Sequence, residues 1–218
     1  MKGLALQTNC KSFTPDTQLI TYCLAHNIPY QFIASPEEMP KNYVPYASVN
    51  FCEQVLGKSF TPNYFPDFIS KQYIGRKYWN TNYAIKGVFI KPADTYKRFS
   101  GFIITAESYP PPPPYFCQDP IKFDSEFRQY VINGKILYSA WYSDASPCIP
   151  APNKSICDIP GDFCGTLDWG YSNNRLLLVE SHLPFSIGWY GPMEDVRIYF
   201  EFMEKGWEYM LKMSQKSI

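Results

Sequence analysis

Three cations follow one apolar segment of this chain. The stretch "VFIKPADTYKRFSGF", residues 88–102, runs from β-branched and aromatic residues into Lys91, Lys97 and Arg98. A lysine at the end of an apolar strand is partly desolvated, which is costly unless an anion pairs with it. A polyphosphate would satisfy all three cations. The plainer interpretation is a hairpin loop whose cations are solvated.

A further arginine lies in "SEFRQYV", residues 125–131. Glu126 and Arg128 are two positions apart on a predicted strand, so both side chains share a face. They could pair with each other. Alternatively, Arg128 points into a cleft and binds a phosphate or carboxylate through two parallel hydrogen bonds.

Two carboxylates flank a predicted hairpin in "LDWGYSNNRLLLVESH", residues 167–182. Asp168 and Glu180 would face each other across the strands and repel unless a cation lies between them. Oxygen ligands favour magnesium as that cation. His182 shares the face of Glu180, either as a further ligand or as a structural hydrogen-bonding group. The alternative is a pair of ordinary surface carboxylates.

The first part of the chain predicts an α/β unit that would precede these motifs. Strands are predicted over "GLALQT", "IPYQFIA" and "YASVNFC". A helix is predicted over "TPDTQLITYCLAHN", with Thr14 as its cap and Pro15 at its first position. No glycine-rich turn follows the first strand, so a dinucleotide-binding fold is not supported.

The rest of the chain predicts hairpins and a final helix. "KGVFIKP" and "GFIIT" are expected to pair around the cation loop, and residues 67–73 to form one or two helical turns. Asn133-Gly134 predicts a two-residue hairpin turn. A C-terminal helix is expected from about Asp195 to Lys212.

Five consecutive prolines, Pro110–Pro114, exclude a helix at this point. The run predicts an extended polyproline segment. It would be a stiff linker between two lobes or, alternatively, a docking motif for an SH3-like partner.

Composition excludes several classes of protein. The 218 residues are 45% hydrophobic and 18% charged with zero formal net charge, which favours a large core and disfavours a nucleic-acid footprint. Seven cysteines without a Cys-x-x-Cys pair and two histidines argue against a zinc cluster or a complete disulfide framework. We expect free thiols in a reducing compartment. No apolar run predicts a signal peptide or a membrane span.

The order of these motifs resembles the ATP-grasp superfamily. The motifs are "FIKPADTYKRFSG", "SEFRQYVINGKI" and "VESHLPFSIGWYG", with Trp207 in "EKGWEYM". They look like those of a compact branch found in bacteria and phages, generally of unknown biochemistry. The likeness spans about residues 85–212.

The resemblance implies an α+β fold in which two lobes with antiparallel sheets hold ATP between them. A small α/β domain over residues 1–65 would precede the lobes. The first lobe would span residues 66–114 and carry the phosphate-gripping loop. The second lobe would span residues 115–218 and carry the metal site and the C-terminal helix.

The resemblance also implies roles for individual residues. Arg128 and Lys97 would be catalytic, with Arg128 reaching the γ-phosphate or an acyl-phosphate. The metal ligands would be Asp168, Glu180 and His182, although the family pattern usually ends in Glu-x-Asn. The nucleotide-binding residues would be Lys91, Lys97, Arg98, Phe116, Cys117, Gln118, Asp119 and Glu126, of which Phe116 to Asp119 would line adenine.

By resemblance, the chain would use ATP and magnesium to activate a carboxylate as an acyl-phosphate, which an amine then attacks. Its substrates would be small molecules or peptides, with neither nucleic acid nor membrane as a partner. The alternative is a non-catalytic nucleotide-binding module that acts through a protein partner. We expect it in the cytoplasm of a bacterial or phage-infected cell; whether it is a monomer or a homodimer stays open.

Overall fold

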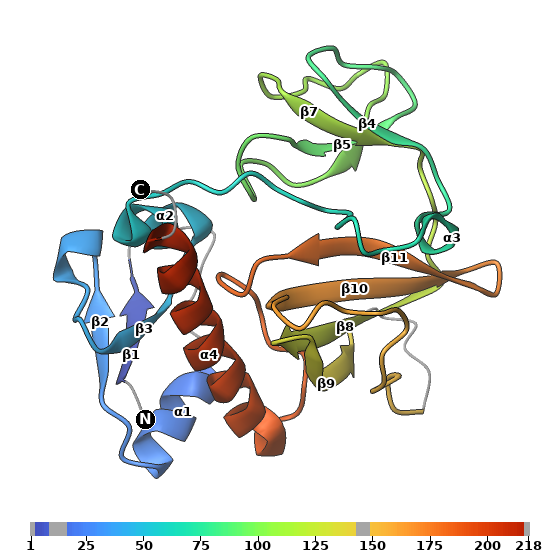
Figure 1. The fold of residues 1–218 in the computed structure, drawn as a ribbon. Coiled ribbons are helices and arrows are strands. Elements are labelled where there is room, and N and C mark those ends of the chain that lie inside the picture. The colour runs from blue at the N-terminus through green and yellow to red at the C-terminus, as the bar shows by residue number, and fades with distance from the viewer. Residues whose placement is uncertain (1–2, 9–16, 143–148, 216–218) are drawn as a thin grey trace.

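Three sheets make up the computed structural model, which describes residues 3–8, 17–142 and 149–215 (Figure 1). One sheet is parallel and lies in the N-terminal part. The other two are antiparallel and have four strands each. This α+β arrangement is the fold class predicted from the sequence.

The N-terminal sheet has the strand order β2-β1-β3, with parallel pairing throughout. Its strands are β1 (Gly3–Gln7), β2 (Tyr30–Ile33) and β3 (Tyr43–Tyr46), with α1 (Thr17–Ala25) between the first two and η1 (Pro36–Glu38) before the third. The predicted strand–helix–strand unit is therefore present. The expected cap at Thr14 and Pro15 lies outside the described residues.

The prediction of a third strand over "YASVNFC" is wrong. β3 ends at Tyr46, and α2 (Val49–Leu56) occupies most of that stretch. Ser48 caps this helix, because its Oγ accepts a hydrogen bond from the Phe51 N–H at 3.4 Å. Gly57 ends it with a φ of 62°. These two local signals outweigh the β-branched and aromatic residues that suggested a strand.

The first antiparallel sheet contains the predicted hairpin around the cation loop. Its strands are β4 (Tyr78–Thr81), β5 (Phe89–Pro92), β6 (Phe102–Ile103) and β7 (Tyr115–Gln118), in the order β4-β7-β5-β6. β5 pairs with β6 as expected. A small core of Ile90, Ile104, Tyr115 and Cys117 lies on one face. The predicted helical turns before the sheet are α3 (Lys71–Ile74).

The proline run does not link two lobes, so that prediction is wrong. It connects β6 to β7, and both strands belong to the same sheet. Arg98 fastens the run by donating hydrogen bonds to the carbonyl oxygens of Pro112 and Pro114, at 2.7 and 3.1 Å. The docking-motif interpretation stays a prediction.

The position of β7 bears on where the first lobe ends. A division after residue 114 would separate β7 from β4 and β5, with which it pairs on its two edges. Asp119 is still tied to this sheet, since its N–H donates to the Lys77 carbonyl at 3.0 Å. We therefore propose that the first lobe extends to Asp119.

The second antiparallel sheet has the longest strands, in the order β11-β10-β8-β9. They are β8 (Ser125–Ile132), β9 (Lys135–Trp141), β10 (Gly165–Ser172) and β11 (Arg175–His182). The predicted two-residue turn at Asn133-Gly134 is confirmed, with φ values of 51° and 71°. A second such turn, Asn173-Asn174, joins β10 to β11.

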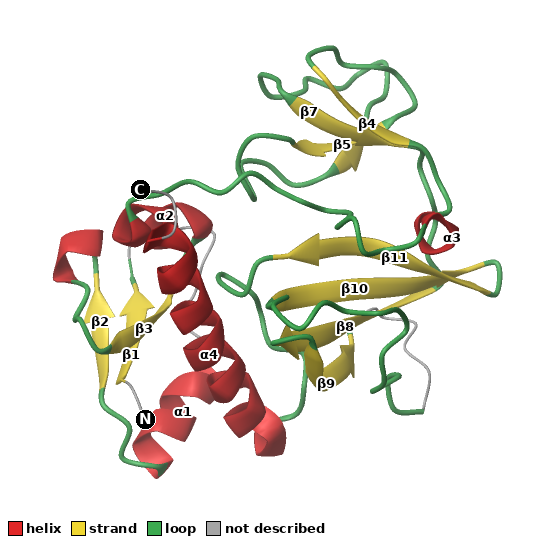
Figure 2. Ribbon diagram, viewed as in Figure 1, coloured by secondary structure: helices red, strands yellow, loops and turns green. Residues whose placement is uncertain are grey.

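α4 (Val196–Gln215), preceded by η2 (Met193–Asp195), confirms the predicted C-terminal helix. It packs against α1, α2 and β3 on one side and against β8 and β9 on the other (Figure 2). Tyr130 on β8 contacts Phe202 of the helix at 5.2 Å between ring centroids. α4 thus fastens the second antiparallel sheet to the N-terminal unit.

No helix in the described part of the chain is long and apolar enough to cross a membrane. The described cysteines are free thiols: Cys23, Cys52, Cys117, Cys157 and Cys164. Cys10 and Cys148 lie outside the described residues.

Candidate active site

Two carboxylates face each other on adjacent strands, as predicted. Asp168 of β10 is the register partner of Glu180 of β11, and a β-bulge follows immediately, before Trp169. His182 lies two residues beyond Glu180, with its Nε2 3.1 Å from Glu180 Oε1. One ligand atom from each of the three residues lies within 4.8 Å of the others. These groups are close enough to share one cation.

Arg128 binds Asp168 through two hydrogen bonds. The Nε–Oδ1 distance is 2.8 Å and the Nη2–Oδ2 distance is 2.7 Å, and both residues are buried. Burial alone would lower the pKa of Arg128, but the charge of Asp168 and these hydrogen bonds raise that pKa well above its usual value. The ring of Tyr190 covers the guanidinium at 4.9 Å.

The predicted alternative of a Glu126–Arg128 pair is not what the structure contains. The two side chains do lie on the same face of β8, but Asp168 takes the arginine because it is directly opposite in the β8–β10 register. Glu126 instead accepts a hydrogen bond from the Tyr142 hydroxyl at 2.7 Å. Burial raises the pKa of Glu126, and the Tyr142 hydrogen bond opposes that rise.

Lys91 of the first antiparallel sheet forms an ion pair with Glu180 of the second. The Lys91 side chain is largely buried, and its ammonium lies 5.0 Å from the centre of the Tyr64 ring. Burial alone would raise the pKa of Glu180, but His182 and Lys91 lower it well below its usual range. The predicted lysine at the strand end therefore reaches the predicted metal site.

The other two cations of the loop diverge. Lys97 donates to the Ser186 carbonyl oxygen, and its pKa is lowered by burial of the amine and by the nearby Arg128. Arg98 instead pairs with Asp94, with a 3.0 Å Nε–Oδ1 distance, and bonds the proline run. The structure therefore brings Lys91 and Lys97 to the carboxylates but turns Arg98 away. The sequence alone did not separate these neighbouring residues, because loop geometry decides their directions.

The predicted adenine-lining residues do not all face the site. β7 is a central strand, and its side chains alternate between the two faces of the sheet. Phe116 is opposite Lys91 in register and shares its face, as does Gln118. Cys117 points to the far face and is buried in the small core, so its side chain does not line the site. Asp119 accepts a hydrogen bond from the Lys77 N–H at 3.1 Å.

Sequence reasoning missed Arg76, which links the two antiparallel sheets. Its guanidinium donates to the carbonyls of Leu178 and Val179 on β11, at 2.9 and 2.8 Å, and to Gln118 Oε1 on β7 at 3.0 Å. Burial lowers the pKa of Arg76 to about 10. β11 is an edge strand and Val179 is the extra residue of its bulge, so these carbonyls can accept hydrogen bonds from a side chain.

Two tyrosines beside His182 were also missed. The ring centroids of Tyr64 and Tyr96 lie 6.2 and 5.8 Å from that of His182. Tyr64 donates to the Pro92 carbonyl at 3.1 Å, and the Tyr96 hydroxyl accepts from the Asn63 N–H at 3.0 Å. The high aromatic content was the only signal for these residues, and it does not say which tyrosines pack together.

The donor set fits magnesium in part. Asp168 and Glu180 supply the carboxylate oxygens that magnesium prefers, whereas the imidazole of His182 is a weaker ligand for it. Arg128 and Lys91 occupy both carboxylates in this structure. A metal ion would therefore bind these oxygens readily only when another anion takes over the two cations.

Comparison with known proteins found no match among curated proteins. Several solved structures are similar over almost the whole chain. D-alanine–D-alanine ligase from Bacillus anthracis, complexed with ATP, is 12% identical, with 100% of this chain and 99% of that chain covered and a TM-score of 0.49. The ATP-grasp ligase PsnB, complexed with a minimal precursor, is 9% identical, with coverages of 98% and 99% and a TM-score of 0.41.

The macrocyclase MdnC from Microcystis aeruginosa MRC, bound with the precursor peptide MdnA, is 9% identical, with coverages of 99% and 100% and a TM-score of 0.38. A sequence model of one protein family, described as ATP-grasp domain, R2K clade family 2, matches residues 69–197. That range is more than half of the chain and contains the paired carboxylates, Arg128 and Lys91. The chain therefore belongs to the ATP-grasp domain family, in family 2 of the R2K clade.

Proposed function

We propose that this protein is an ATP- and magnesium-dependent ligase that joins a carboxylate to an amine. The observation that carries the proposal is the ion pair between Lys91 of one antiparallel sheet and Glu180 of the other, beside the Arg128–Asp168 pair. Two cationic and two anionic side chains, contributed by both lobes, therefore lie side by side. Such a centre can exchange its internal partners for a polyphosphate and a cation.

In this proposal the cations and the carboxylates separate when nucleotide binds. Lys91, Lys97 and Arg128 bind phosphate oxygens through charge-assisted hydrogen bonds. Asp168 and Glu180 are then free to hold magnesium, with His182 beside them. Magnesium, when bound, neutralises phosphate charge and polarises the phosphoryl group that is transferred.

The base of the nucleotide would lie between the two antiparallel sheets. Phe116 and Gln118 face this space, and Arg76 crosses it from Gln118 to β11. The backbone of β7 is engaged by β4 and β5 on its two edges. We therefore propose that backbone hydrogen bonds to adenine come from the residues that follow Asp119.

The reaction has two steps whose atoms and charges balance. A carboxylate oxygen attacks the γ-phosphorus of ATP, the bond to the β-phosphate oxygen breaks, and ADP leaves. The nitrogen of an amine then attacks the acyl carbon of the acyl-phosphate, phosphate leaves, and the proton lost by the amine passes to solvent. Lys97 and Arg128 serve by offsetting charge on the transferred phosphoryl group, which is mainly a positioning and electrostatic task.

A non-catalytic nucleotide-binding module is the second candidate. It is favoured by His182, which stands where the family pattern usually has asparagine and is already bound to Glu180. In that case ATP would bind Lys91 and Lys97 without turnover, and magnesium would matter little.

The experiment that separates the two candidates measures binding and turnover together. Purified protein is given ATP and magnesium, with or without pooled amino acids, and phosphate release is followed. Calorimetry measures ATP affinity with magnesium and with a chelator. Stimulated phosphate release together with magnesium-dependent affinity supports the ligase. Tight binding without release, unchanged by the chelator, supports the module instead.

A further inference from the structure

A cavity of about 580 Å³ lies directly beside the charged centre. Its walls come from the segment 61–68, from the loop 160–164 that precedes β10, from the end of β11 and from the end of α4. Phe68 and Phe163 form one wall, with an edge-to-face contact at 5.0 Å between ring centroids. The cavity is therefore partly aromatic.

Two residues of this cavity also belong to the surroundings of the charged centre. His182 lines the cavity, and its Nε2 contacts Glu180. Tyr96 lines it too and immediately precedes Lys97 in the cation loop. A molecule in the cavity would thus contact one proposed metal ligand, His182, and the residue that precedes the proposed phosphate ligand Lys97.

The charge of the cavity is opposite to what an anionic substrate needs. Asp67 and Asp162 line it as exposed carboxylates, and the described residues of its wall include no lysine or arginine. The nearby cations Lys91 and Arg128 are already paired with carboxylates. With two carboxylates and no lysine or arginine among the described residues of its wall, the cavity favours an ammonium group over a carboxylate.

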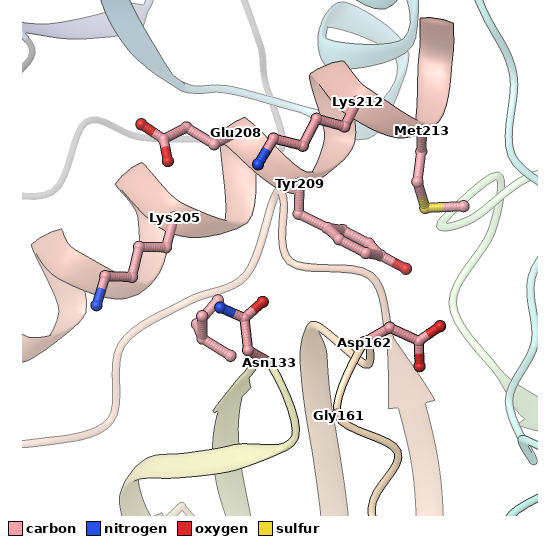
Figure 3. A pocket seen from close by; sticks show the side chains of 9 residues that line it. Asn133, Gly161, Asp162, Lys205, Glu208, Tyr209, Lys212 and Met213 are labelled. Carbon is pink, nitrogen blue, oxygen red and sulfur yellow. The ribbon is translucent and has the colours of Figure 1, made fainter. Parts of the chain in front are cut away.

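The cavity adjoins a second hollow of about 390 Å³, with which it shares Asp162, Tyr209 and Met213. Figure 3 shows this outer hollow, with Tyr209 extending from α4 toward the loop that carries Asp162. Lys205 and Lys212 of α4 lie on its rim with Glu208. Cavities of about 300–1,000 Å³ are typical of sites that bind drug-sized ligands.

We propose that the cavity beside His182 binds the amine substrate of the ligase, and that this substrate carries its ammonium group on an apolar, peptide-sized body. Asp67 and Asp162 select the ammonium, which loses one proton to solvent before its nitrogen attacks the acyl carbon, while Phe68 and Phe163 contact the apolar part. The outer hollow holds the remainder of the molecule. This inference rests on the proposed ligase function and specifies which of the two joined groups enters through this cavity.

A binding experiment on the full chain tests the charge selection directly. The probe is phenylalaninamide, an aromatic primary amine without a carboxylate. N-acetylphenylalaninamide is its neutral counterpart and 3-phenylpropionate its anionic one. Affinities are measured by ligand-observed NMR for the wild type and for a double variant, Asp67→Asn with Asp162→Asn. Both side chains are exposed, so the substitutions should leave the fold intact.

The expected result is at least tenfold tighter binding of phenylalaninamide than of either counterpart in the wild type, with that preference lost in the double variant. The control is Glu107→Gln with Asp158→Asn, which removes two exposed carboxylates elsewhere. It should bind like the wild type. Equal affinities for the three probes, no binding of phenylalaninamide, or an unchanged preference in the double variant would overturn the proposal.

Turnover distinguishes this proposal from the ligase function itself. If phosphate release is stimulated by amines, the double variant should raise the KM for the amine at least tenfold and leave the KM for ATP unchanged. If amines stimulate phosphate release but the double variant has the same KM for the amine as the wild type, the protein is a ligase whose amine does not bind in this cavity. Selective amine binding without any turnover would show that the cavity binds amines but that the proposed ligase function is wrong.

Discussion

The two antiparallel sheets contribute to the same site but differ in how they are built. In the first, no strand exceeds four residues, and its buried face closes a small core around Ile90 and Cys117. In the second, the strands have seven or eight residues. Its residues Phe127 and Leu167 belong to the main core, which continues through α4 into the N-terminal unit. The first sheet reaches the main core through Phe116 of β7, whereas the second contributes buried residues from β8, β10 and β11, so the second sheet is better anchored.

This difference matches what each sheet supplies. Metal ligands and a bidentate arginine need fixed positions, and Asp168, Glu180 and Arg128 all come from the long strands. A phosphate contact tolerates more freedom, and Lys91 offers one charge on a flexible stem from a short strand. Regions with few buried apolar contacts open more readily than the main core. We infer that the first sheet moves and the second stays fixed when nucleotide binds.

The largest expected effect is a loss of turnover on substitution of a residue in the second antiparallel sheet. Glu180→Gln keeps the shape of the side chain and removes its charge. We expect a loss of about a thousandfold in turnover, about 4 kcal/mol of transition-state stabilisation, because one metal ligand and one compensating charge disappear. The measurement is phosphate release, together with ATP affinity in the presence of magnesium or a chelator.

Glu107→Gln is the matched control, since Glu107 is an exposed glutamate in the segment between β6 and β7. It should behave like the wild type in both measurements. An ATP affinity that responds neither to the chelator nor to Glu180→Gln would mean that these carboxylates are not the metal site, and the fixed sheet would lose its proposed role.

A pair of core substitutions tests the difference in anchoring. Leu167→Ala and Ile90→Ala each truncate a fully buried side chain, one from each sheet, at a cost of about 2–5 kcal/mol. We expect Leu167→Ala to lower the free energy of global unfolding. Ile90→Ala should chiefly speed hydrogen exchange within β4, β5 and β7, because their small core is separate from the main one. Hydrogen-exchange mass spectrometry resolves the two patterns.

Identical exchange patterns for Leu167→Ala and Ile90→Ala would contradict the inference that the first sheet opens by itself. The two sheets would then unfold as one cooperative unit, and the separation of the cores would have no energetic consequence.

A smaller effect is expected on nucleotide affinity, from the short sheet. Lys91→Met retains most of the apolar stem and removes the ammonium. Each lost charge-assisted contact with phosphate should weaken ATP binding by about 1.5–3 kcal/mol, which is roughly 10- to 150-fold in affinity. Calorimetry on protein whose circular dichroism matches the wild type measures this. Unchanged affinity would remove Lys91 from the nucleotide site.

Much of this site could be predicted from the sequence because the periodicity of a strand determines which side chains share a face. The alternation of side chains places Glu126 with Arg128, and Glu180 with His182, whatever the tertiary structure. The Asn-Gly turn fixes the register of β8 with β9 only as far as Val131, beyond which the register shifts. The structure confirms that Asp168 and Glu180 face each other, but the turn alone does not place them so. A regular hairpin from Asn173-Asn174 would put Val179 opposite Asp168, and the bulge at Val179 brings Glu180 there instead.

The rest depended on contacts between elements that are distant in the chain. Arg76 binds two carbonyls of the edge strand β11, and no pattern near residue 76 indicates this. Arg128 pairs with Asp168 instead of Glu126, because the β8–β10 register places Asp168 directly opposite it. Asp168 lies 40 residues further along the chain. The strand predicted over residues 46–52 failed for a local reason, since the Ser48 cap was overlooked.

The smallest expected effect concerns Arg98, whose neighbour Lys97 differs from it in direction. In the structure the guanidinium of Arg98 bonds Asp94 and the carbonyls of Pro112 and Pro114. These exposed contacts hold the loop against the proline run and place no charge at the carboxylates. Arg98→Gln should therefore change ATP affinity by less than about 0.5 kcal/mol, since exposed ion pairs contribute little. Lys97→Gln, one residue away, should weaken ATP binding clearly more. Calorimetry on both variants, under the conditions used for Lys91→Met, makes the comparison.

If Arg98→Gln weakens ATP binding as much as Lys91→Met does, the loop must change its conformation when ATP binds and bring all three cations to the phosphates. The loop between β5 and β6 would then rearrange in addition to the movement of the whole first sheet. The motion of that sheet relative to the second would be larger than its short strands alone indicate.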